Sequence, residues 1–139
     1  MYFLKTQDSF DAAHFLKDYQ GKCKNIHGHR WKVIVEIKRE DLEKSGPKRG
    51  MVVDFADLKQ ELKDICDKLD HSLIYEKGSL KDATLEALKA EDFRMVELDF
   101  VPTAENFSEY FYRLMQGKGF DVKRVEVYET PNNCAAYEE

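Results

Sequence analysis

The sequence predicts an α+β fold, in which four strands form a sheet and two main helices cover it. Three observations support this prediction: apolar and polar residues alternate over 28–39, and apolar residues recur at helical spacing over 54–69 and over 103–117. With 42% apolar and 12% aromatic residues, the 139 residues can fill one core but hardly two. We therefore expect a single domain over 1–139.

Strands are expected at four segments: 2–14, 28–39, 96–100 and 122–130. The first is rich in aromatic and aliphatic residues and contains no glycine or proline. In three of these segments an apolar row ends in an ionisable residue, namely His14, His29 and Glu129. A hairpin-like antiparallel pairing of the first two strands, joined by the loop 15–26, would bring His14 close to His29.

Helices are expected at three segments: 54–69, 79–91 and 103–117. The first carries an apolar stripe from Phe55 to Leu69, and Asp54 can act as its N-cap. The middle segment has the weakest helical pattern. Thr103 can cap the last helix, and Gly117 and Gly119 follow at its end.

The charge pattern excludes several classes of partner. The net charge of -5 is spread along the chain without a basic run, which argues against a nucleic-acid partner. No apolar window approaches a membrane span, and charges occur throughout the first thirty residues, so we expect no signal peptide, no membrane partner and a cytoplasmic protein. Three cysteines do not form a disulfide framework, and we expect Cys66 and Cys134 to be small buried residues.

The stretch from Cys23 to His29 concentrates the reactive side chains. His27 and His29 are two residues apart, so on an extended chain both rings leave on the same face. Each ionisable row end, taken alone, is well explained as a strand end that reaches solvent or as a histidine bonded to a backbone carbonyl. Taken together, the three ionisable residues that end apolar rows favour a shared metal site, in which His14 joins the pair of His27 and His29.

Two kinds of metal site remain open from the residues alone. Three neutral imidazoles favour zinc and leave one tetrahedral position for water or substrate, as in catalytic sites. Alternatively, Cys23 is the fourth ligand, which closes the site and makes the metal structural. If Cys23 is free beside the ion, the positive charge lowers the pKa of its thiol and makes a thiolate available as base or nucleophile.

Five motifs, in this order, resemble those of the 6-pyruvoyl-tetrahydropterin synthase family. They are Phe10 to His14, Cys23 with His27-Gly28-His29, Leu69-Asp70-His71, Pro102 to Asn106, and Tyr128-Glu129-Thr130. The short gap between Cys23 and His27 is similar to that of the bacterial branch, the 6-carboxy-5,6,7,8-tetrahydropterin synthases. The match spans nearly the whole chain.

The resemblance implies a tunnelling fold (T-fold): a four-stranded antiparallel sheet with two main helices packed on one face. In this family the subunits join edge to edge into a barrel, so it also implies a homo-oligomer, a hexamer or tetramer, with active sites at subunit interfaces. The segment 76–100 is longer than in the shortest family members, and we expect it to pack at a barrel rim.

The resemblance also implies residue roles. His14, His27 and His29 would hold Zn²⁺, and Cys23 would be the general base.

Asp70 and His71 would form a relay that assists proton transfer, and Glu129 would anchor the pterin. A carboxylate can accept both parallel donors of a guanidine-like pterin edge. Thr103 and Glu105 would be secondary contacts in the substrate pocket, although helix capping also explains that segment.

The implied reaction converts 7,8-dihydroneopterin triphosphate to 6-carboxy-5,6,7,8-tetrahydropterin, acetaldehyde and triphosphate, an early step of queuosine and 7-deazaguanine biosynthesis. Alternatives are a pyruvoyl-forming synthase, sepiapterin side-chain cleavage, and a zinc-stabilised binding module without turnover. Four cationic residues are candidates for the triphosphate, or else a solvated face: Lys22, Lys24, Arg30 and Lys32.

Overall fold

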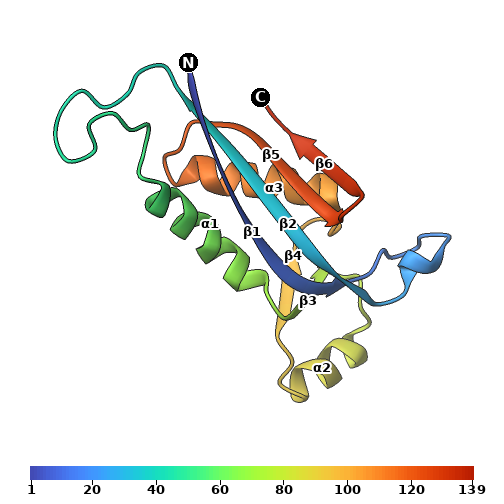
Figure 1. Ribbon diagram of the computed structural model, residues 1–139. Helices are drawn as coiled ribbons and strands as arrows, with labels where there is room; N and C mark the ends of the chain where they lie inside the picture. Colours follow the sequence, from blue (N-terminus) through green and yellow to red (C-terminus); the bar gives the residue numbers. More distant parts are fainter.

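Two long strands, β1 (Tyr2–His14) and β2 (His27–Arg39), form the centre of the fold in the computed structural model, which describes all 139 residues (Figure 1). They pair antiparallel without a break, from Tyr2 opposite Arg39 to His14 opposite His27. Their alternating apolar residues face the core, and Trp31 is completely buried. Both predicted strands and their antiparallel pairing are confirmed.

The sheet has six strands, in the order β4-β3-β1-β2-β5-β6. The other four are β3 (Ser72–Glu76), β4 (Met95–Leu98), β5 (Val122–Thr130) and β6 (Asn133–Tyr137). The sequence predicted four strands because the residues of β3 and β6, unlike those of the shorter β4, do not alternate between apolar and polar. The sheet is also mixed rather than antiparallel throughout, since β3 runs parallel to β1 and β4 runs parallel to β3.

Two helices, α1 (Phe55–Leu69) and α3 (Ala104–Gly117), pack along the sheet as predicted (Figure 1). The side chain of Asp54 accepts a hydrogen bond from the Ala56 N–H, and that of Thr103 accepts one from the Asn106 N–H, so both predicted N-caps are confirmed. The short α2 (Asp82–Ala90) buries none of its residues. It makes the crossover that two parallel strands, β3 and β4, require.

The core lies between the sheet and these two helices. Around Phe10 gather the rings of Trp31, Phe107 and Phe111, with ring centroids 5.9–6.0 Å from that of Phe10. Cys66 is buried in this core as predicted. The prediction for Cys134 was wrong: it is exposed, because it belongs to β6 at the outer edge of the sheet.

None of the helices is both long and apolar enough to cross a membrane.

Candidate metal centre

The register between β1 and β2 brings three histidines together at one end of the hairpin. His14 lies opposite His27, and Ala12 lies opposite His29, so His14 and His29 are diagonal neighbours on one face. The ring centroids of the three histidines are 4.6, 5.2 and 4.9 Å apart. The predicted convergence of His14, His27 and His29 is therefore present within a single chain.

The Nε2 atoms of the three rings are buried and have no hydrogen-bond partner. Two of the rings are oriented from behind by backbone carbonyls: Nδ1 of His14 donates to the Pro102 carbonyl, and Nδ1 of His27 donates to the Asn25 carbonyl, both at 2.7 Å. A proton on Nδ1 leaves Nε2 with a free lone pair, which is the tautomer that a metal ligand needs. Burying a polar nitrogen without a hydrogen-bond partner costs free energy unless a ligand binds the nitrogen.

Glu129 supplies a fourth ligand atom. One carboxylate oxygen lies 3.2 Å from Nε2 of His14 and 3.4 Å from Nε2 of His29. The ligand atoms of all four residues lie within 4.8 Å of one another. Zinc bonds of about 2.0–2.1 Å would place the corners of a tetrahedron about 3.3–3.4 Å apart, so these two distances suit such an ion. The cluster could bind a metal.

The protonation state of the histidines suits metal binding. The pKa of His14 is lowered from 6.5 to about 4, mainly by burial and also by the nearby His27 and His29, while the hydrogen bond to the Pro102 carbonyl opposes this shift. Burial also lowers the pKa of His29, although the charge of Glu129 opposes this. Both rings are therefore neutral at pH 7 and keep their lone pairs.

Trp31 forms an apolar floor under the cluster. Its ring lies edge-on to His14 and to His29, with centroids 4.9 and 5.5 Å away. Together with Phe10 and Phe107, it excludes water from the inner side of the site. This floor is what desolvates His14, which is only 1% exposed.

Cys23 lies in η1 (Lys22–Lys24), a short 3-10 turn in the loop that precedes His27. Its side chain is half-buried, and its carbonyl accepts a hydrogen bond from the Leu16 N–H. Its sulfur does not belong to the group of four converging ligand atoms. The fourth atom is a Glu129 oxygen instead, which argues against Cys23 as the fourth ligand.

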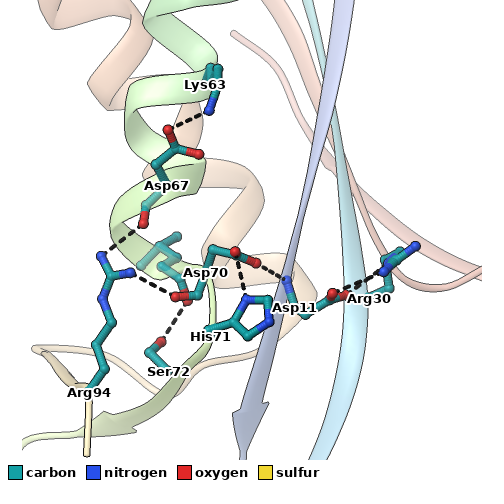
Figure 2. A network of polar contacts seen from close by, with 9 residues as sticks. Asp11, Arg30, Lys63, Asp67, Asp70, His71, Ser72 and Arg94 are labelled. Atoms are coloured by element: carbon teal, nitrogen blue, oxygen red, sulfur yellow. Dashed lines mark hydrogen bonds and ion pairs between the residues drawn. The ribbon is translucent and has the colours of Figure 1, made fainter.

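Asp70 and His71 are also brought together, but at a different place. Nδ1 of His71 donates to one Asp70 oxygen at 2.7 Å, and the Asp11 N–H donates to the other at 2.7 Å (Figure 2). These bonds, that from the Asp11 N–H above all, hold the pKa of Asp70 below its usual range, so it stays a carboxylate. Asp11 pairs with Arg30 at 2.9 and 3.0 Å.

His71 faces the opposite side of the sheet from the histidine cluster. It lines a cavity of about 590 Å³ with Asp11, Ala13 and Arg30, and His29 also borders this cavity. Side chains alternate along a strand, so Asp11 and Ala13 project from the face opposite to His14. No hydrogen bond joins Cys23 to Asp70 or His71 within the chain. Within one chain, neither Asp70 nor His71 contributes a ligand atom to the metal cluster.

Glu129 also lines a second cavity, of about 430 Å³, together with His29, Lys32 and Tyr128. The Lys32 ammonium lies 4.2 Å above the centre of the Tyr128 ring. This cavity opens directly beside the metal cluster, since His29 and Glu129 belong to both.

Thr103 and Glu105 stay predicted as secondary substrate contacts. The Thr103 hydroxyl is engaged as the N-cap of α3, and the Glu105 side chain is exposed. Neither residue lines the two cavities described above. The adjacent Pro102 matters more, because its carbonyl orients His14. Sequence reasoning missed the carbonyls of Asn25 and Pro102, since any residue can supply a carbonyl and no pattern marks it.

Comparisons with known proteins find similarity to tetrahydropterin synthases. The family model for 6-pyruvoyl tetrahydropterin synthase matches residues 3–139. A 6-carboxy-5,6,7,8-tetrahydropterin synthase of Haemophilus influenzae is 36% identical, with 100% of each chain covered. One of Synechocystis is 35% identical, covering 99% of this chain and 93% of its own. A solved 6-pyruvoyl tetrahydropterin synthase of Caenorhabditis elegans superposes with a TM-score of 0.69 at 27% identity, covering 99% of this chain and 95% of that one.

Proposed function

This chain belongs to the 6-pyruvoyl tetrahydropterin synthase family, and from that premise we propose that it makes 6-carboxy-5,6,7,8-tetrahydropterin from 7,8-dihydroneopterin triphosphate. The reaction takes up water and releases acetaldehyde and triphosphate. The observation that carries the proposal is the convergence of three unpartnered histidine nitrogens and Glu129 in a chain with relatives of that activity. The predicted tunnelling fold and enzymatic character follow from the family.

The donor set favours zinc as the metal. Three imidazole nitrogens suit Zn²⁺ better than the hard cations, which prefer oxygen ligands throughout. Bound by His14, His27 and His29, zinc would polarise the oxygens of the substrate side chain and acidify the neighbouring C–H and O–H groups. Proton movements at those positions then fall to side chains of the protein.

Cys23 is the proposed general base. It lies in the loop that leads into His27, and its thiol is free and half-buried. A thiolate near a bound cation is a competent proton acceptor, and such a base contributes about 10²- to 10⁴-fold to a proton transfer.

The Asp70–His71 pair is the proposed proton relay. Asp70 is a carboxylate that fixes the His71 ring through Nδ1, so Nε2 can exchange protons with substrate. Since His71 faces the other side of the sheet from the cluster of its own chain, the pair would act in the site of a neighbouring subunit. This arrangement supports the homo-oligomer with active sites at subunit interfaces that we propose.

Glu129 and Lys32 are the proposed substrate contacts in the 430 Å³ cavity. The Glu129 carboxylate can accept two parallel N–H donors of the pterin edge, beside the metal. For the triphosphate, Lys32 is a better candidate than Arg30, because Arg30 is already paired with Asp11.

The product would feed queuosine and 7-deazaguanine synthesis. Three free cysteines, Cys23, Cys66 and Cys134, are compatible with the reducing cytoplasm in which we place the enzyme.

Product analysis tests the proposal. The purified zinc-loaded protein is incubated with 7,8-dihydroneopterin triphosphate, and the products are identified by mass spectrometry and an acetaldehyde assay. We expect 6-carboxy-tetrahydropterin with equimolar acetaldehyde, and no turnover in H29A, which lacks one metal ligand. Formation of 6-pyruvoyl-tetrahydropterin would assign the chain to the pyruvoyl-forming reaction instead. Absence of any turnover in zinc-loaded wild type would favour a binding module.

A further inference from the structure

The peptide group between Asp70 and His71 is held from both sides, and Figure 2 shows the bond from Arg94. Its N–H, from His71, donates to the Asp11 carbonyl at 2.6 Å. Its carbonyl, from Asp70, accepts a hydrogen bond from Nη1 of Arg94 at 2.9 Å. Both polar groups of the link between the two relay residues are therefore fixed, one by β1 and the other by an arginine more than twenty residues further along the chain.

This peptide group needs such support because the backbone turns sharply at His71. Helix α1 ends at Leu69, and Asp70 follows with an extended backbone. His71 then has φ of +54°, in the left-handed region that is unfavourable for a residue with a side chain. Strained positions of this kind persist only when their surroundings hold them in place.

Arg94 also replaces a hydrogen bond that α1 loses at its end. In a continued helix the His71 N–H would donate to the Asp67 carbonyl, but here it goes to Asp11. Nη2 of Arg94 donates to the Asp67 carbonyl at 2.8 Å instead. One planar guanidinium thus bonds two carbonyls at the C-terminus of α1, where a positive charge is favourable.

Arg94 reaches this position because of the segment around α2. It immediately precedes β4, and the Leu73 N–H donates to the Arg94 carbonyl at 3.0 Å. The parallel pairing of β4 with β3, with Met95 opposite Leu73, places the arginine beside the end of α1. The β3–α2–β4 unit therefore has a defined contact with the Asp70–His71 turn.

We propose that Arg94 is a positioning residue for the Asp70–His71 relay, and that the β3–α2–β4 unit serves the active site by carrying it. Arg94 belongs neither to the metal cluster nor to the 430 Å³ cavity, and it borders the 590 Å³ cavity together with His71. It acts by fixing the peptide group from which the His71 ring projects, so that Asp70 can hold Nδ1 and leave Nε2 free. The proposal rests on the proposed function for its catalytic consequence, but its structural part stands on these contacts alone.

The experiment compares R94A and R94K with R39A in the full-length zinc-loaded protein. Arg39 is a matched control, because its Nη1 also donates to a backbone carbonyl, that of Val52, in the loop between β2 and α1. Steady-state kinetics give kcat and KM for 7,8-dihydroneopterin triphosphate, and metal analysis gives the zinc content. NMR of ¹⁵N-histidine-labelled protein reports the tautomer of His71 and the hydrogen exchange of its amide.

We expect R94A to lower kcat about 10- to 100-fold with KM and zinc content unchanged, as displacement of a catalytic group by about 1 Å can do. His71 should lose its single Nδ1-protonated tautomer, and its amide should exchange faster. R94K keeps the positive charge but not the planar guanidinium, so its kcat should lie between those of R94A and wild type. R39A should keep the wild-type tautomer and a kcat within about twofold of wild type.

An unchanged His71 tautomer and amide exchange in R94A would overturn the positioning role, and so would an altered tautomer with unchanged kcat. A loss of kcat in R39A equal to that in R94A would also overturn it, because general destabilisation would then explain both. If wild type shows no turnover, the proposed function fails. In that event the NMR comparison still decides whether Arg94 holds His71.

Discussion

Buried His14 predicts an unusual pH dependence of stability for the metal-free protein. Its ring has a pKa of about 4 in the folded chain, against 6.5 when exposed, because it is removed from water. Between these two values the unfolded chain binds more protons than the folded one. This part of the stability is therefore fully present above pH 6.5 and is lost as the pH falls towards 4.

The size of the effect follows from the two pKa values. A pKa lowered from 6.5 to about 4 corresponds to about 3 kcal/mol in total, and about 2 kcal/mol of this is lost between pH 7 and pH 5. His14 is only 1% exposed, so solvent screening does not reduce this value much. Losing about 2 kcal/mol is a large fraction of the stability of a typical domain.

The assay is urea unfolding of metal-free protein at pH 7 and pH 5, with the chain concentration held fixed because subunit association would also affect stability. The perturbation is H14N, whose amide N–H can still donate to the Pro102 carbonyl but cannot titrate. We expect the unfolding free energy of H14N to fall by about 2 kcal/mol less than that of wild type over this interval.

Equal pH dependence of wild type and H14N would refute the reasoning, because it would mean that His14 is already charged in the folded chain at pH 5. A steeper fall in H14N would contradict the sign of the effect. His29, whose pKa is also lowered by burial, contributes in the same direction in both proteins, so it does not affect the comparison.

Three further predictions concern the site and its frame. C23A should abolish turnover while binding as much zinc as wild type by elemental analysis, because the metal ligands remain; loss of the zinc would show that the sulfur is a ligand. Removal of zinc by a chelator should abolish activity but leave the circular dichroism spectrum unchanged, since none of the cluster residues belongs to the 21-residue hydrophobic core; unfolding would mark a structural zinc. T103A should lower the unfolding free energy in urea by about 1 kcal/mol through loss of the α3 N-cap, and no change would show that the hydroxyl bond to the Asn106 N–H contributes nothing.

Many of the strands and helices could be predicted from the periodicity of apolar residues alone. β1, β5, α1 and α3 begin or end within a residue of their predicted limits, because each buries one regular face against a common core. The β3–α2–β4 unit could not be predicted with its topology. Its strands are short, and nothing in their residues indicates that they pair parallel to β1 and to each other.

The functional site, like the fold, could be predicted only in part. His14, His29 and Glu129 stood out because each replaces an apolar residue at the end of an inward-facing row, and the structure brings all three together. What the sequence could not reveal is the orientation of these groups. The carbonyls that fix the histidines and the arginine that fixes the Asp70–His71 turn depend on contacts between segments far apart in the chain.

The central claim is that three histidines of one chain hold the metal without the sulfur of Cys23. X-ray absorption at the zinc edge of the metal-loaded protein tests it most directly. We predict nitrogen and oxygen neighbours at about 2.0–2.1 Å, with the multiple-scattering pattern of three imidazoles. A sulfur neighbour at about 2.3 Å, or fewer than three imidazoles, would contradict the claim.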